Sequence, residues 1–426
     1  MPDGRTKRIV LRALQRCPDF SGIATMPLPR SRKGRALLQW LDQSGLALSF
    51  LTRVQSHENG ARLPDEWRNV LEPRRERNAI RFQDMLMEFQ RLNHSFHARG
   101  ILAITLKGFS LVPDFCKDPG LRHQTDFDFL VAQDDVEAAA AVLVSCGYST
   151  ARLSNSEESC FTTPHRHVPT SKDDLYAIQH HRQVDLHVSL AENTPWITLD
   201  SGLDVSRDAV PMLLDGAHFH GLALADRFVA QVLHAFRHSF RSWIRLSWLM
   251  EIGHCMELHQ ENEALWTRVM ERAGRAPLTK RIFALVLSLT NRLFHSRIPP
   301  RLRSWFADGL TPSLRVWLDY FSVNWAISDW PGNLSNLFLA PEFIPDKKLR
   351  MRYLAGRLIP KRERLTIETM ARHEKKKPLA WNLQRWQYVA HRSGVHLRDL
   401  LYLPLEQLRW KRALAAARAG LFGLDS

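Results

Sequence analysis

Apolar residues recur at helical spacing in the stretch before residue 100. Six of them are three or four positions apart: Phe82, Met85, Leu86, Phe89, Leu92 and Phe96. This spacing places them on one face of a helix, and Gly100 follows where such a helix would end. Residues 37–71 carry apolar clusters at similar spacing, and we expect Pro64 and Pro73 to bound the end of that segment. The pattern predicts helices that bury one apolar stripe.

The hydrophobic pattern changes after Gly100. Three short apolar runs have the length of buried strands: residues 101–106, 125–131 and 183–190. Between the second and third runs, Asp134 and Asp135 are expected to cap a helix that ends at Gly147. Helices and strands in this order predict an α+β fold, in which a small mixed β-sheet is embedded in a largely helical chain.

From residue 223 the pattern is helical for most of the remaining chain, and Pro299 and Pro300 interrupt it. We therefore expect four regions. They are a basic N-terminal arm and helical region (1–99), a core that holds the strands (100–200), a helical domain packed on that core (201–298), and a basic C-terminal helical region (299–426).

The composition is that of a folded globular protein. Of the 426 residues, 45% are hydrophobic and 24% are charged, which excludes a disordered or fibrous chain. The longest apolar runs are far shorter than the ~20 residues that a transmembrane helix needs, so we expect no transmembrane segment. The five cysteines are far apart and form no Cys-x-x-Cys pair, which favours reduced thiols and a cytoplasmic protein.

The positive charge is concentrated in two segments, which we call the basic arms. The formal net charge is +15; residues 1–35 contain nine Lys or Arg against two acids, and residues 347–377 contain twelve against three. Two interpretations remain open: the arms bind a polyanionic acceptor such as tRNA, or they form solvated helical faces and a charged loop. The basic amphipathic stretch 405–421 likewise either touches a membrane surface or packs back on the protein.

Two of the predicted strands carry acidic residues on one face. Side chains alternate along a strand, so Asp126 and Asp128 share one face, opposite the intervening phenylalanines. By the same alternation, Asp185 and His187 share a face of the third apolar run. If these two strands are neighbours, three carboxylates converge.

Three converging carboxylates predict a divalent metal site. Like charges raise one another's pKa and cost free energy unless a cation neutralises them. Mg²⁺ takes carboxylate oxygens and keeps positions for phosphates, and two ions held by shared acids clamp a phosphoryl group. We therefore expect Asp126, Asp128 and Asp185 to bind Mg²⁺, with two ions. The alternative is an exposed acidic edge that discourages strand pairing.

Cationic residues and a glycine lie close to these acids in the sequence. Lys107 and Gly108 follow the first predicted strand, and glycine lets backbone N–H groups approach an anion closely. Arg122 lies four residues before Asp126. We expect Lys107, Gly108 and Arg122 to bind the phosphates of a nucleotide; the alternative for the two cations is a solvated surface position.

The order and spacing of these motifs resemble those of the uncharacterised nucleotidyltransferase family, part of the DNA-polymerase-β-like nucleotidyltransferase superfamily. The resemblance rests on LKG at 106–108, R-x-x-x-D-F-D-F-L-V at 122–131, a helix that ends at 147–148, and V-D-L-H at 184–187. It extends over residues 30–260. Lys107 stands where the superfamily has a small residue, and the spacer from Gly108 to Asp126 is longer than in minimal members.

This resemblance implies that residues 100–200 form a nucleotidyltransferase catalytic core. It implies transfer of a nucleoside monophosphate from a nucleoside triphosphate, such as ATP, to an acceptor, with release of pyrophosphate. Asp126 and Asp128 would be the paired metal ligands, and Asp185 would bind the catalytic metal or orient the acceptor hydroxyl. The acceptor is unidentified: a small molecule, a peptide or an RNA.

Two other functions remain open. A non-catalytic protein with the same fold would bind nucleotide or RNA through the basic arms. A zinc hydrolase would use the histidines near Asp185, or His234 and His238, which are four residues apart. These two histidines, with Arg241, would otherwise bind nucleotide or pack in the core. Glu251 stands where the family commonly has an Asp.

Overall fold

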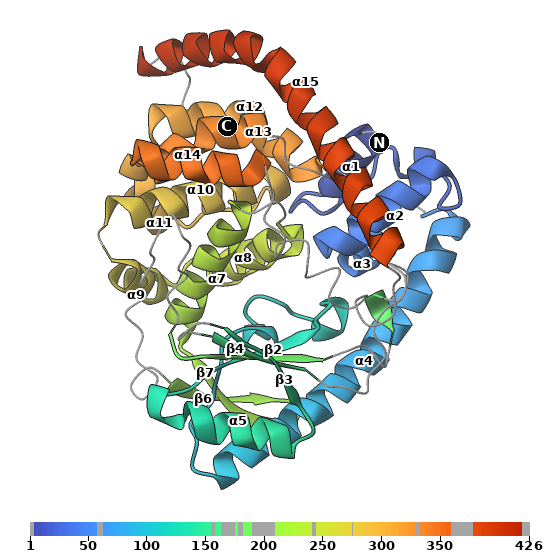
Figure 1. The fold of residues 1–426 in the computed structure, drawn as a ribbon, viewed down its shortest axis with the longest axis vertical. Coiled ribbons are helices and arrows are strands. Elements are labelled where there is room, and N and C mark those ends of the chain that lie inside the picture. Colours follow the sequence, from blue (N-terminus) through green and yellow to red (C-terminus); the bar gives the residue numbers. More distant parts are fainter. Residues whose placement is uncertain are drawn as a thin grey trace.

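The computed structural model describes most of the chain (Figure 1). The described residues are 4–57, 63–154, 158–162, 175–177, 182–189, 209–240, 244–274, 276–328, 333–358 and 378–419. Within them, one β-sheet lies beneath a body of helices, and the long helix α4 (Asp65–Ala98) runs along the sheet.

The described residues form one seven-stranded sheet, in the order β3-β4-β5-β2-β1-β7-β6. The strands are β1 (Ile104–Thr105), β2 (Asp126–Leu130), β3 (Ser149–Ser154), β4 (Glu158–Thr162), β5 (Gln183–His187), β6 (Ala209–Leu214) and β7 (Ala217–Leu222). The pairs β2 with β5 and β1 with β7 are parallel, and the other neighbouring pairs are antiparallel. A mixed sheet in a largely helical chain confirms the predicted α+β fold.

The sheet is larger than the three predicted strands, which correspond to β1, β2 and β5. The hairpin of β6 and β7 lies beyond residue 200, in the region expected to be helical, and it extends the sheet through the pairing of β7 with β1. Its turn is Asp215-Gly216, with φ of 46° and 81°. Asp-Gly between alternating apolar positions is a strong hairpin signal, so this strand pair was readable from the sequence.

Helix α4 buries its apolar stripe against the sheet, as predicted. The ring centroids of Phe89 and Phe96 lie 5.9 and 5.3 Å from that of Phe129 on β2. The helix ends at Ala98, and Gly100 follows with a φ of 69°, a backbone conformation that glycine adopts without strain.

The start of α4 differs from the prediction. Pro73 lies inside the helix, so the expectation that it bounds a segment is wrong. Proline removes one backbone hydrogen bond from a helix interior. Trp67 and Leu71, in the turns before it, are both 0% exposed, and their packing keeps the helix continuous.

Helix α5 (Val136–Ser145) is present and is followed by Gly147 with a φ of 90°. The predicted capping by Asp134 and Asp135 is wrong, because Asp135 occupies the N-cap position without a side-chain hydrogen bond to the helix. A capping side chain requires an extended backbone. Asp135 is instead in the right-handed helical region, since the short 3₁₀ turn η4 (Gln133–Asp135) leads directly into the helix.

Helices from both ends of the chain form one body above the sheet (Figure 1). The N-terminal ones are α1 (Gly4–Ala13), α2 (Arg32–Ser44) and α3 (Ala47–Gln55). The others are α7 (Leu224–Ser239), α8 (Leu246–Leu258), α9 (Glu263–Ala273), α10 (Pro277–Phe294), α11 (Pro300–Phe306), α12 (Pro312–Ile327), α13 (Asn333–Phe343), α14 (Lys347–Leu358) and α15 (Pro378–Arg418). No helix in the described ranges is both long and apolar enough to cross a membrane.

The basic arms are partly built into this body. Lys7 on α1 is 1% exposed, its Nζ donates to the Ile327 carbonyl at 2.8 Å, and it lies 5.2 Å from the centroid of the Trp40 ring. This member of the first arm is therefore a core residue. The second arm contributes α14, and its residues 359–377 lie outside the described part of the chain.

Candidate active site

The acidic residues of β2 and β5 lie on adjacent strands. The two strands pair in parallel, with Asp128 opposite Asp185 and Asp126 opposite Gln183. Phe127 and its strand neighbours belong to the apolar cluster on the α4 side of the sheet. Since side chains alternate, the three aspartates therefore share the opposite face.

Asp128 is 6% exposed and lies between two nitrogen donors. Lys107 Nζ is 2.9 Å and His187 Nε2 is 3.2 Å from its Oδ1. Burial alone would raise the pKa of Asp128, but Lys107 and His187 outweigh burial and hold the pKa well below its ordinary value. Asp128 is therefore ionised at neutral pH.

Asp126 shows the opposite shift. Burial and the negative charge of Asp128 raise the pKa of Asp126, although Lys107 and two arginines act against them. Two acids on one strand face thus differ in how readily they ionise. A cation beside Asp126 would relieve this cost, which is the electrostatic setting in which metal ions bind.

Asp185 is held by a neighbour on its own strand. The side-chain amide of Gln183 donates from Nε2 to both carboxylate oxygens of Asp185, at 2.8 and 2.9 Å. Gln183 was not among the predicted site residues. The signal was its position two residues before Asp185, which places both side chains on the same face of a strand.

The turn after β1 packs closely against the segment that leads into β2. Gly108 has a φ of 64° and begins the 3₁₀ turn η2 (Gly108–Leu111). A Cβ at this position would lie 2.2 Å from Gln124 Nε2, which donates to the Asp126 carbonyl at 2.8 Å. The glycine therefore lets the Gln124 side chain lie against the turn, beside the acidic strand.

Arg122 is anchored by the helical body. Its Nε donates to Glu251 Oε1 on α8 at 3.1 Å, and its Nη1 is 3.5 Å from Gln124 Oε1. Burial disfavours the charged form of Arg122, but Glu251 raises its pKa above the ordinary value. Glu251, which carried no predicted role, thus fixes a cation of the site from 129 residues away in the sequence.

Further arginines near Asp126 were also missed. Arg81 on α4 and Arg245 before α8 approach the two nitrogens of the His123 ring, at 2.7 and 3.1 Å. Burial and the neighbouring Arg182 and Arg245 lower the pKa of Arg81 to about 9. These cations come from separate elements, so no local motif marks them.

Comparison with protein families identifies the chain. The model of the uncharacterised nucleotidyltransferase family matches residues 31–295, more than half of the sequence, including the acidic residues of β2 and β5. The chain belongs to this family. Membership supports a generic role in nucleotidyl transfer. Searches among curated proteins and among solved structures found no match.

For a nucleotidyltransferase, the donor chemistry of this face fits Mg²⁺. Adjacent strands supply carboxylate oxygens, the ligands that Mg²⁺ prefers. Within the described ranges, no three His, Cys, Asp or Glu side chains are grouped closely enough to hold a metal ion. Instead, donors from Lys107, His187 and Gln183 contact the oxygens of Asp128 and Asp185.

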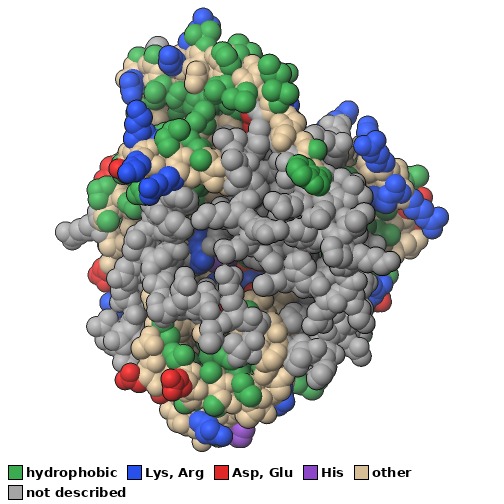
Figure 2. Space-filling view, viewed as in Figure 1, with side chains coloured by type: hydrophobic (Ala, Val, Ile, Leu, Met, Phe, Trp, Pro, Cys, Tyr) green, Lys and Arg blue, Asp and Glu red, His purple; other side chains and the backbone are tan. Residues whose placement is uncertain are grey.

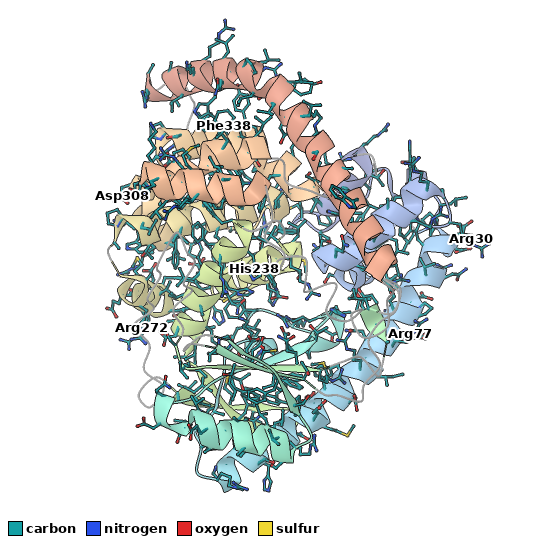
Figure 3. The ribbon with its side chains drawn as sticks, viewed as in Figure 1. Arg30, Arg77, His238, Arg272, Asp308 and Phe338 are labelled. Carbon is teal, nitrogen blue, oxygen red and sulfur yellow. The ribbon has the colours of Figure 1, made fainter. Side chains whose placement is uncertain are left out.

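The histidines proposed for zinc belong to an aromatic cluster. The rings of His234 and His238 on α7 lie 4.6 Å apart, and each is within 4.6 Å of the Trp248 ring. Figure 3 labels His238, which lies between the helical body and the sheet. Arg241 and the histidines of 165–181 lie outside the described residues.

Proposed function

We propose that this protein transfers a nucleoside monophosphate from a nucleoside triphosphate to an acceptor, with release of pyrophosphate, in a Mg²⁺-dependent reaction. The observation that carries the proposal is the in-register pairing of Asp128 with Asp185 on one polar face of the sheet. Family membership supports the reaction class.

Asp126, Asp128 and Asp185 are the residues that would hold Mg²⁺, with two ions expected. Bound Mg²⁺ would neutralise the carboxylates and stabilise the negative charge that develops on the phosphoryl oxygens. The contribution of the chain is positional. The pairing of β2 with β5 places the carboxylates of Asp128 and Asp185 side by side on neighbouring strands. Gln183 fixes the orientation of the Asp185 carboxylate.

In the reaction, an oxygen of the acceptor forms a bond to the α-phosphorus, and the bond from that phosphorus to the bridging oxygen of pyrophosphate breaks. The proton of the acceptor hydroxyl passes to a carboxylate. Asp185 orients the acceptor hydroxyl.

Lys107 has two partners in this proposal. Its ammonium neutralises Asp128 at 2.9 Å in the structure, and the same ammonium binds the triphosphate when nucleotide is present. Lysine suits this exchange because its charge is compact and its side chain is flexible. Gly108 contributes the backbone of the turn that holds Lys107 beside β2.

Arg122 is the second phosphate-binding cation. The Nε of Arg122 donates to Glu251, and its Nη1 lies close to the side-chain oxygen of Gln124. These two contacts hold the guanidinium plane in one orientation towards the acidic face. Glu251 is therefore a positioning residue, which acts on the nucleotide through Arg122.

The experiment that tests this function is label transfer from nucleotide to acceptor. The purified protein is incubated with each α-labelled nucleoside triphosphate, Mg²⁺ and total cell extract. We expect one class of molecule to become labelled by the wild-type protein and not by Asp128→Asn or Asp185→Asn. Equal labelling by both variants would refute the assigned roles. Absence of labelling together with salt-sensitive RNA retention in all three proteins would favour the non-catalytic binder.

A further inference from the structure

Helix α15 has two apolar faces, of which one is covered. On the covered face, the Trp410 ring stacks on Phe338 of α13, with centroids 4.8 Å apart, and lies 6.3 Å from Phe321 of α12. Ala413 on the same face is 5% exposed. Figure 3 labels Phe338 beneath α15. The described part of the stretch 405–421, which ends at residue 419, thus packs back on the protein through this face.

The opposite face of α15 is apolar and exposed. Its large side chains are Trp386 at 70%, Leu397 at 61%, Leu401 at 75% and Leu408 at 47% exposure. At about 100° per residue, these four positions fall within about 60° of one another around the helix axis. They point away from Trp410. Their span of 22 residues corresponds to a stripe roughly 33 Å long.

The exposed face is convex. Figure 1 shows α15 as a long helix that bends around the outside of the helical body, and Pro404 lies inside it on the exposed side. Proline lacks the N–H that would close the helical hydrogen bond there and allows such a bend. A convex apolar ridge is not shaped to receive another chain in a groove, whereas it can sink into a deformable surface.

The charged residues of α15 indicate which kind of surface its exposed face would bind. The helix α15 contains seven Lys or Arg and two acids. Both acids lie toward the covered face, where Asp399 pairs with Arg398 at 3.5 Å and Glu406 with Arg409 at 2.8 Å. Lys411 and Arg412 lie beside the exposed stripe, and among the described residues neither forms an ion pair. Figure 2 shows Lys and Arg side chains close to the hydrophobic ones at the top of the molecule.

We propose that the outer face of α15 binds an anionic membrane surface, with Trp386 and the exposed leucines in the interfacial layer and Lys411 and Arg412 at the lipid headgroups. An amphipathic helix with an apolar stripe and flanking cations lies in this way at a bilayer surface without spanning it. A second copy of the chain fits less well, because face-to-face pairing of two such helices would bring cationic flanks together without facing acids. The proposal does not depend on the proposed enzymatic function.

The test is co-sedimentation of the full-length protein with vesicles of phosphatidylcholine alone, or of phosphatidylcholine with phosphatidylglycerol. We expect wild-type protein to pellet with the anionic vesicles and to stay in solution with the neutral ones. The double variant L401D/L408D is expected to partition at least about tenfold less strongly, because it places charges where two exposed leucines would enter the interfacial layer. The double variant K411E/R412E is expected to lose a similar factor on anionic vesicles.

Matched controls separate binding from folding. Leu213→Asp changes an exposed leucine on β6, 64% exposed, and should bind anionic vesicles as the wild type does. Asp128→Asn should also bind normally, which distinguishes this inference from the enzymatic one. Wild-type protein that stays in solution with anionic vesicles overturns the proposal, as does equal pelleting of L401D/L408D. A wild-type dimer in light scattering that L401D/L408D dissociates also overturns it, because the face would then bind a second copy.

Discussion

The two faces of strands β2 and β5 differ in chemistry although they come from the same ten residues, and on the acidic face Leu130, at the end of β2, is the one apolar side chain of the ten. The face toward α4 carries Phe127, Phe129 and two aliphatic residues of β5, all at most 2% exposed and packed in one apolar cluster. The face toward the helical body carries three aspartates and a histidine, each held by a named polar partner or shifted in pKa.

This difference separates what stabilises the protein from what it does. Apolar packing lowers the free energy of the folded state in proportion to the area buried. Grouped carboxylates cost free energy in the absence of a cation. Asp126 carries such a cost, whereas Asp128 is compensated by Lys107 and His187, and we attribute the grouping of these acids to function. Changes on the two faces should affect different measurements.

The largest effect is expected for Asp128→Asn on the polar face. It removes the carboxylate that contacts Lys107 and His187, and we expect nucleotidyl transfer to fall by about 1000-fold, as for loss of one preorganised charged group. Pyrophosphate release measures it. Asp134→Asn, at an exposed acid of η4, is the matched control and should keep full activity. An equal loss of activity in both variants would contradict the assignment of function to the acidic face.

Phe129→Ala tests the apolar face. Phe129 is 0% exposed and contacts two phenylalanines of α4, so its truncation should lower the free energy of unfolding by about 3–5 kcal/mol. Denaturant titration measures this loss. Val144→Ala, at a residue of α5 that is 55% exposed, should change stability by less than about 0.5 kcal/mol. A Phe129→Ala protein with wild-type stability would contradict the assignment of the core.

Glu251→Gln tests the connection between the polar face and the helical body. It removes the charge opposite Arg122, and we expect kcat/KM for the nucleotide to fall about tenfold, the usual effect of losing an orienting partner, mostly through KM. Steady-state kinetics separates the two constants. Glu263→Gln, at an exposed acid that pairs with Arg301, should leave both unchanged. A decrease in kcat alone would mean that Glu251 does not act through Arg122.

The smallest effect is expected for Asp126→Asn, which should change how the stability of the protein depends on pH. Because its pKa is raised in the folded protein, its ionisation costs stability as pH rises through that pKa, and the cost is absent below the ordinary value of 3.8. Asp126→Asn cannot ionise, so at pH 7 its Tm should exceed that of the wild type by about 2 °C. The gain should disappear as the pH approaches 3.8. Asp128→Asn should not show this gain, since the pKa of Asp128 is lowered.

Sequence reasoning found the central part of this site because the information is local. Asp126 and Asp128 on one strand face follow from alternation over three residues, and so does the apolar opposite face. Membership of the sheet was predictable for β2 and β5 from their apolar runs. The Asp-Gly turn before β7 carried an equally local signal.

The rest of the site depends on contacts between distant segments. Arg122 meets Glu251 across 129 residues, and Arg81 meets His123 across 42. No spacing in the sequence indicates such a pair, because each depends on how α4 and α8 pack against the sheet. Pro73 shows the same limit in the fold, since burial of neighbouring residues overrides its local preference.

The most direct test of the central claim follows the two ends of the nucleotide in parallel reactions. One contains an α-labelled and the other a γ-labelled nucleoside triphosphate, each with Mg²⁺, the acceptor found in extract, and wild-type protein or Asp128→Asn. The account predicts that wild-type protein moves α-label to the acceptor and releases γ-label in pyrophosphate, and that the variant does neither. Transfer of γ-label to the acceptor, or release of label as inorganic phosphate, would contradict it.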